Sequence, residues 1–146
     1  MAIKKIVCCT DFSENAKAAV KTAIEMAEKY QARLSIIHVL PPVINPMFAE
    51  AAMMLSDEPK DSLLLKLEQQ MQTEYGDGLG EHIKHDLVVL DGHVSTEILR
   101  YLEDNQTDVV VMGSYGLSGM GLVVFGSVAK RISHKAPCSV MIVRKS

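Results

Sequence analysis

The glycines of the C-terminal third are spaced in a way that could bind phosphate. An apolar run over 109–112 ends at Gly113, Gly116 follows, and nine residues later the chain reads Gly126-Ser127 and enters a helical pattern. Glycine permits positive φ angles and close approach of a ligand, and N–H groups at a helix N-terminus attract anions. Ser127 could cap that helix or donate its hydroxyl to a phosphate oxygen. The spacing predicts a phosphate site; the alternative is a glycine-rich connection that only turns the chain.

Two common nucleotide motifs do not fit these residues. Gly121 and Gly126 have the spacing of a P-loop, but Ser127 occupies the place where that motif requires a lysine. The dinucleotide fingerprint G-x-G-x-x-G is missing from the turn after the first apolar run, where the chain reads Cys9-Thr10-Asp11-Phe12-Ser13. We therefore expect neither a P-loop NTPase nor a dinucleotide-binding protein.

The turn that contains Asp11 predicts a different contact. A carboxylate at this place repels phosphate but accepts hydrogen bonds, so it suits ribose hydroxyls or the edge of a base. The alternative is that Asp11 only helps to cap the helix that follows.

Other residue types give weaker indications of chemistry. On a strand, His82 and His85 would point to opposite faces, so they cannot easily share a metal ion. The methionines between 47 and 54 are more typical of core or interface residues than of copper ligands. Cys8, Cys9 and Cys138 are too few for a disulfide framework, and we expect buried thiols. No sequence pattern of a catalytic nucleophile is present.

Composition narrows the class of protein. The chain has 146 residues, of which 48% are hydrophobic and 23% charged, and a formal net charge of −3. These values are typical of one globular domain, and we expect residues 1–146 to form it. Without a cluster of Lys and Arg, a nucleic-acid partner is not expected. No apolar run is long enough to span a membrane and the first residues do not resemble a signal peptide, which favours the cytoplasm.

Hydrophobic periodicity predicts alternating strands and helices. Ser13 is expected to cap a helix whose apolar face includes Ala16, Val20 and Ala23, and a second helix is expected over 61–75, capped by Asp61 or Ser62 and stopped by Gly76. A third helix follows the Asp91-Gly92 turn, with Ser95 or His93 as its cap, and a fourth is expected over 127–135. The Met-rich residues 43–59 are expected to form a long connection. Strands are expected over 3–9, 34–39, 82–90, 108–112 and 138–143.

This order predicts an α/β fold: an open, doubly wound, parallel five-stranded sheet with helices on both faces. In such sheets a ligand binds beyond the carboxyl ends of the strands, where the strand order reverses. Asp11 and the glycine loop are then expected to face each other.

Several motifs together resemble the universal stress protein family over essentially the whole chain. Its nucleotide-binding members carry Gly-x2-Gly-x9-Gly-Ser/Thr, which matches Gly113, Gly116, Gly126 and Ser127. Further matches are the turn 10–13, His38-Val39, Asp91-Gly92 and Ala136-Pro137-Cys138. Two positions depart from the family pattern: Cys9 stands where relatives often have proline, and Tyr115 where a basic residue or histidine is common.

The resemblance implies a set of site residues and a ligand. Asp11 would hold ribose, beside Thr10, and the backbone near Val39 would contact adenine. The glycines and Ser127 would hold ribose and phosphates. The ligand would be ATP or AMP, with Mg²⁺ or Mn²⁺ bound through the phosphates. The family also implies a homodimer, and the apolar strand 138–143 would otherwise leave a sheet edge open.

Three functions follow from this sequence. The first is a cytoplasmic, dimeric stress-response regulator that binds an adenine nucleotide and acts through an unidentified regulatory protein. The second is a slow ATPase, for which no general base can be named. The third is an interaction protein that does not bind nucleotide and whose glycine loop is vestigial.

Overall fold

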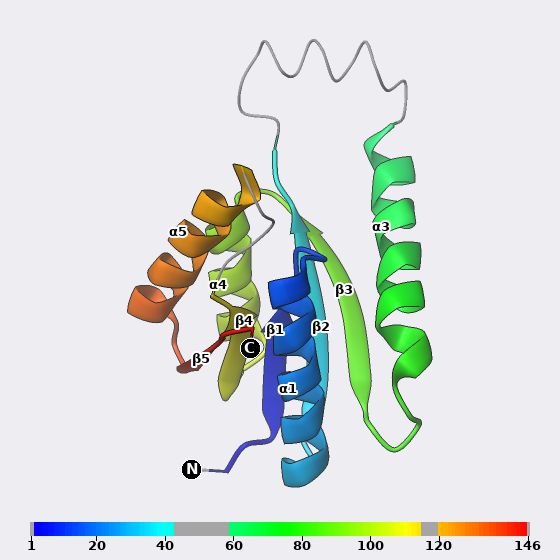
Figure 1. Cartoon of the computed structure of the whole chain (residues 1–146), viewed down its shortest axis with the longest axis vertical. Coiled ribbons are helices and arrows are strands. Elements are labelled where there is room, and N and C mark those ends of the chain that lie inside the picture. The colour runs from blue at the N-terminus through cyan, green and yellow to red at the C-terminus, as the bar shows by residue number, and fades with distance from the viewer. Residues whose placement is uncertain (1, 43–58, 115–119, 146) are drawn as a thin grey trace.

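The computed structural model describes residues 2–42, 59–114 and 120–145. Five strands alternate with four described helices (Figure 1). In chain order the elements are β1 (Lys5–Cys9), α1 (Glu14–Tyr30), β2 (Arg33–Leu40), α3 (Lys60–Glu74), the short 3₁₀ turn η1 (Gly76–Gly78), β3 (His85–Asp91), α4 (Val94–Asp104), β4 (Val109–Gly113), α5 (Met120–Lys135) and β5 (Ser139–Val143).

The five strands form one parallel sheet in the order β3-β2-β1-β4-β5. The chain first adds strands on one side of β1 and then, with β4 and β5, on the other. The strand order therefore reverses between β1 and β4, and this confirms the predicted doubly wound, open sheet.

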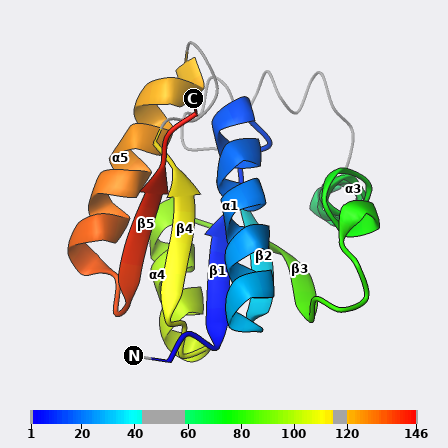
Figure 2. The ribbon, with the colours of Figure 1, turned by 60° about the horizontal axis from the view of Figure 1, so that its bottom comes forward.

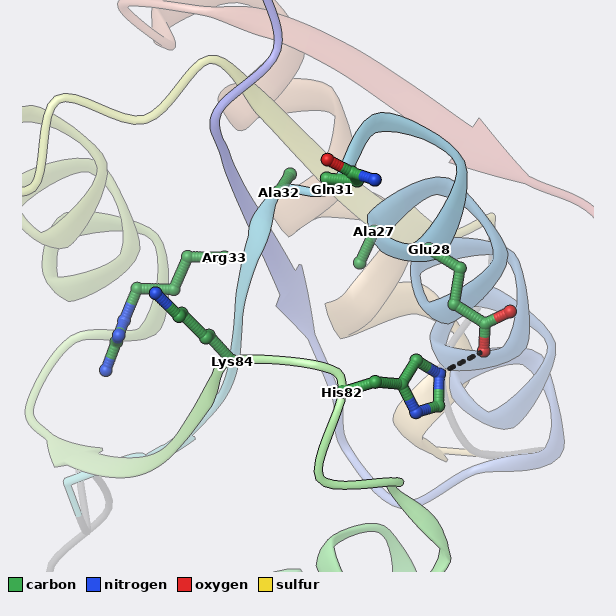
Figure 3. A pocket seen from close by; sticks show the side chains of 7 residues that line it. All are labelled: Ala27, Glu28, Gln31, Ala32, Arg33, His82 and Lys84. Carbon is green, nitrogen blue, oxygen red and sulfur yellow. Dashed lines mark ion pairs between the residues drawn. The ribbon is translucent and has the colours of Figure 1, made fainter.

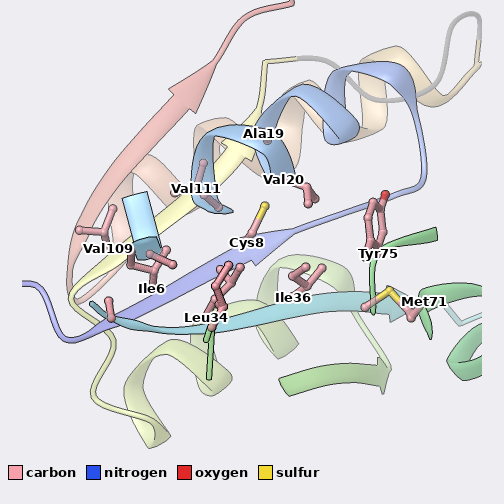
Figure 4. Packing of buried hydrophobic residues seen from close by; sticks show 14 residues of the cluster. Ile6, Cys8, Ala19, Val20, Leu34, Ile36, Met71, Tyr75, Val109 and Val111 are labelled. Atoms are coloured by element: carbon pink, nitrogen blue, oxygen red, sulfur yellow. The ribbon is translucent and has the colours of Figure 1, made fainter. Parts of the chain in front are cut away.

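Helices cover both faces of the sheet (Figure 2). On one face α1 and the C-terminal end of α3 pack on alternate strand residues such as Cys8, Ile36 and Val111 (Figure 4). On the other face α4 and α5 pack on the intervening residues, among them Cys9, Val39 and Met112. The central strands β1 and β4 are apolar and buried on both faces, as the inner strands of a parallel sheet require, whereas the edge strand β5 is partly exposed.

The predicted N-terminal caps of α1 and α4 are confirmed. The hydroxyl of Ser13 accepts a hydrogen bond from the N–H of Ala16 at 3.2 Å, so Ser13 is the N-cap of α1. Ala16, Val20 and Ala23 lie on its buried face. Of the two residues expected to cap α4, it is His93 that does so, with Nδ1 3.4 Å from the N–H of Thr96.

Three expectations about helices and strands were wrong in detail. Helix α5 begins at Met120 and not at Ser127, so Gly126 and Ser127 lie inside it. A glycine within a helix costs only about 1 kcal/mol, which is too little to prevent a helix from continuing through this position. Pro59 occupies the N-cap of α3 and makes no side-chain cap, so neither Asp61 nor Ser62 caps this helix. His82 precedes β3, which begins at His85. The expected connection at 43–59 lies, except for Pro59, outside the described residues.

Candidate functional site

The ends of β1 and β4 meet at the carboxyl edge of the sheet. Cys8 is paired with Val111, and two residues further along each strand the chain reaches Thr10 and Gly113. On its other side the N–H of Thr10 donates to the carbonyl of Ile37 in β2 at 2.9 Å. The turn that carries Asp11 therefore lies between the end of β2 and the start of the glycine loop, at the predicted reversal of strand order.

Asp11 lies in a turn that leads into α1. Its Oδ1 accepts a hydrogen bond from the N–H of Ser13 at 3.0 Å, and its side chain is half-buried. The carboxylate thus helps to shape the entry to the helix, as the capping interpretation expected. That Asp11 binds ribose stays a prediction. One of its two carboxylate oxygens is already hydrogen-bonded to Ser13.

The start of the glycine loop packs tightly against α1. Gly113 is buried, and a Cβ at this position would lie 3.0 Å from the carbonyl carbon and oxygen of Asn15. Glycine lets β4 end this close to the first turn of α1 without a shift of the neighbouring backbone. The amide of Ser114 donates to the carbonyl of Val143 at 3.0 Å, so the chain stays in register with β5 one residue beyond β4.

The remaining predicted site residues lie on β2 and α5. Val39 is buried on the face covered by α4 and α5 and is paired with Leu90 of β3. Gly126 lies in α5, where a Cβ would meet none of the described atoms within 4 Å, and Ser127 is exposed. Gly116 and Tyr115 lie outside the described residues. The fold thus brings Thr10, Asp11 and Gly113 together; the other positions join them only as a proposal.

Three side chains that the sequence analysis did not assign to the site lie in or against the turn after β1. Tyr75 lies just beyond α3, and its hydroxyl is 2.6 Å from the hydroxyl of Thr10. Nδ1 of His38 is 2.8 Å from the carbonyl oxygen of Thr10. The ring of Phe12 lies 4.7 Å from the His38 ring and is stacked on that of Tyr75 at 6.0 Å. The sequence did contain one indication that Tyr75 is buried: it follows Met71 by four residues and so continues the buried face of α3.

Burial changes the acidity of two of these groups. It lowers the pKa of His38, although the Thr10 carbonyl and the Asp11 carboxylate act in the opposite direction. Burial raises the pKa of Tyr75 to about 12, although the hydrogen bond with Thr10 opposes this shift. Both side chains are therefore uncharged at neutral pH and serve the turn as hydrogen-bonding and stacking groups.

Comparison with known proteins identifies the family. A protein-family model described as "Universal stress protein family" matches residues 2–144. The chain belongs to the universal stress protein family. Universal stress protein MJ0531 of Methanocaldococcus jannaschii is 31% identical over 97% of this chain and 82% of its own length. Universal stress protein Sll1388 of Synechocystis is 30% identical over 99% of both chains.

Solved structures of universal stress proteins have the same fold. Protein MJ0577 of Methanocaldococcus jannaschii has a TM-score of 0.74 and 25% identity and covers 100% of this chain and 99% of its own. A universal stress protein in complex with cAMP has a TM-score of 0.66 and 21% identity, with 100% of both chains covered. One from Archaeoglobus fulgidus in complex with dAMP has a TM-score of 0.66 and 18% identity, covering 97% of this chain and 98% of its own.

The thiols of this family member do not line the candidate site as reactive groups. Cys8 and Cys9 are buried, as expected, while Cys138 is half-buried. Burial raises the pKa of Cys8 well above the ordinary value and that of Cys9 to about 12, so both stay protonated at neutral pH. A protonated, buried thiol is a poor nucleophile and metal ligand.

The described parts of this universal stress protein show a hollow at the opposite edge of the sheet from the Asp11 turn (Figure 3). It has a volume of about 420 Å³ and is lined by side chains from the end of α1, the start of β2 and the residues before β3. His82 lies here, and its Nε2 is 3.6 Å from Oε1 of Glu28. Within residues 2–42, 59–114 and 120–145 no cluster of three or more His, Cys, Asp or Glu could hold a metal ion, and no helix could cross a membrane.

Proposed function

We propose that this chain binds an adenine nucleotide, ATP or AMP, at the carboxyl edge of the sheet and acts as a regulator in the stress response. The observation that carries the proposal is the reversal of strand order between β1 and β4, which puts the Thr10-Asp11 turn beside Gly113. A ligand of the doubly wound fold binds at such a reversal.

The chemistry of this edge suits the parts of a nucleotide. Asp11 offers a carboxylate to ribose hydroxyls, and the backbone near Val39 offers hydrogen bonds to adenine. The phosphates would lie toward Gly126 and Ser127, where a Cβ on Gly126 would meet none of the described atoms within 4 Å. The cAMP and dAMP bound by the two structural neighbours support an adenine nucleotide as the ligand. In this proposal Mg²⁺ or Mn²⁺ would accompany the nucleotide through its phosphates and not through a set of side chains.

The edge strand β5 supports a homodimer. It is the last strand of the sheet, and Met141 and Ile142 are 38% and 40% exposed. Consecutive strand residues point to opposite faces, so β5 presents one apolar side chain on each face beside its unpaired backbone. Pairing with β5 of a second copy would cover both side chains and the unpaired backbone. We expect the dimer to act in the cytoplasm with a regulatory protein as partner.

Direct measurement of bound and titratable nucleotide tests the proposal. In the first measurement, purified protein is denatured and the released small molecules are identified by mass spectrometry. In the second, protein freed of nucleotide is titrated calorimetrically with ATP, AMP and cAMP, with and without Mg²⁺. We expect adenine nucleotide in at least one of the two measurements. Asp11→Ala should weaken binding, whereas Asp104→Ala, at an exposed aspartate that ends α4, should not. The absence of both co-purified and titratable nucleotide would overturn the proposal.

A further inference from the structure

A residue at the C-terminal end of α3 contacts the turn after β1. Thr10 and Tyr75 are 65 residues apart in the chain, only 3% and 6% exposed, and joined by a hydrogen bond of 2.6 Å between their hydroxyls. The same Thr10 Oγ1 accepts a hydrogen bond from the N–H of Phe12 at 3.0 Å. A continuous hydrogen-bonded path therefore runs from the backbone of the turn to the end of α3.

The backbone of this turn needs such support. Phe12 has a φ of 65°, in the left-handed region that bulky residues rarely occupy. This conformation costs on the order of 1 to 2 kcal/mol and persists only where neighbouring groups fix it. The aromatic ring of Phe12, between those of His38 and Tyr75, and the hydrogen bond from its N–H supply that restraint.

His38 holds the same turn from β2. Its Nδ1 lies 2.8 Å from the Thr10 carbonyl, and because a carbonyl oxygen can only accept, Nδ1 carries the proton. Asp11 lies between Thr10 and Phe12 in the chain. Thr10 is hydrogen-bonded through its hydroxyl and its carbonyl, and Phe12 through its N–H. The position of the Asp11 carboxylate is thus set by groups on β2 and α3 as well as by its own hydrogen bond to Ser13.

We propose that Tyr75 is a positioning residue of the nucleotide site: through Thr10 and Phe12 it fixes the turn that presents Asp11 to the nucleoside. This inference rests on the proposed function. Phenylalanine would fill the same space without a polar group to bury, and a buried hydroxyl is costly unless it is hydrogen-bonded. The hydroxyl of Tyr75 lies within hydrogen-bonding distance of the Thr10 hydroxyl, which also accepts the hydrogen bond from the N–H of the strained Phe12. Since the turn faces the sugar and base, Tyr75 should affect nucleoside binding and not phosphate binding.

Calorimetric titration of Tyr75→Phe with ATP and with adenosine tests this role. The variant keeps the ring on Phe12 and loses only the hydrogen bond. We expect the affinities for ATP and adenosine to fall by the same factor, about three- to tenfold. Hydrogen exchange at the amides of Phe12 and Ser13 in the nucleotide-free protein should become faster. Tyr30→Phe, at an exposed tyrosine that ends α1, is the matched control and should change none of these.

A second variant tests the path itself. Thr10→Val removes the hydroxyl between Tyr75 and Phe12, and the double variant with Tyr75→Phe should lose no more affinity than the larger of the two single losses. Wild-type affinity in Tyr75→Phe, a loss for ATP but not for adenosine, or additive losses in the double variant would overturn the role of Tyr75 while leaving nucleotide binding intact. A wild-type protein that binds neither ligand would overturn the proposed function and this inference together.

Discussion

Gly113 and Asn15 approach each other so closely that a side chain on Gly113 would force the neighbouring backbone to shift. A Cβ on Gly113 would lie 3.0 Å from the carbonyl carbon and oxygen of Asn15 and 3.2 Å from its Cβ. Asn15 belongs to the first turn of α1, directly after the Asp11 turn. The first glycine of the loop motif therefore has a structural task in the free protein: it lets β4 end against the helix that begins beside Asp11.

Gly113→Ala should destabilise the fold. The methyl group forces the backbone of α1 and β4 apart by a few tenths of an ångström, and overpacking of this kind costs about 1 to 3 kcal/mol. The free energy of unfolding from urea titration measures this. Gly78→Ala is the control, because a Cβ there meets nothing within 4 Å, and it should change stability by about 0.5 kcal/mol or less. Equal losses in both variants would contradict the steric explanation.

Gly126→Ala should have opposite effects on stability and binding. The residue lies within α5, and a Cβ built on it would meet none of the described atoms within 4 Å, so alanine should raise the free energy of unfolding by up to about 1 kcal/mol. The same methyl would occupy space proposed for the phosphates, and ATP affinity should fall by about tenfold or more. Ser133→Ala, at an exposed position of the same helix, controls for helix propensity and should leave affinity unchanged. Unaltered affinity in Gly126→Ala would remove this glycine from the site.

Local patterns were sufficient to predict much of the fold. Five apolar runs separated by helical periodicity indicate a parallel sheet with helices on both faces, because the inner strands of such a sheet are buried on both sides. The cap at Ser13 was also predictable, since its hydrogen bond to Ala16 depends on residues three apart. The start of α5 was not, because Gly126-Ser127 resembles a helix start although the chain already forms a helix at Met120.

The candidate site was predictable only where its residues belong to the reversal of strand order. Asp11 and Gly113 come at the ends of two apolar runs, and topology alone brings them together. Tyr75 and His38 reach Thr10 through tertiary contacts, one of them across 65 residues, that no local pattern specifies. The left-handed Phe12 is likewise imposed by its neighbours and not by its own preference.

Stability should fall at alkaline pH. Burial raises the pKa of Cys9 and of Tyr75 to about 12, from ordinary values of 9.0 and 10.0. The unfolded chain therefore loses these protons first, so the stabilisation is fully present below pH 9 and is lost as the pH rises toward 12. Tyr75 alone contributes on the order of 2 kcal/mol to this loss. Urea unfolding of reduced protein at several values between pH 8 and 11 measures the decline.

Tyr75→Phe separates the tyrosine from the thiols in that experiment. The variant should keep the decline that begins near pH 9, which belongs to Cys8 and Cys9, and should lose part of the decline above pH 10. A profile identical to that of the wild type throughout would mean that Tyr75 ionises as readily in the folded chain as in the unfolded one.

Charge on the outer strand should separate the proposed dimer. Met141→Lys places an ammonium group on β5, where a second copy would pair, and lysine on an edge strand opposes pairing between sheets. Sedimentation velocity should show a dimer for the wild type and a monomer for this variant at the same concentration. Leu65→Lys is the control, since Leu65 of α3 is 55% exposed but lies away from β5 (Figure 1), and it should remain dimeric. Dissociation by Leu65→Lys and not by Met141→Lys would move the interface from the sheet edge to α3.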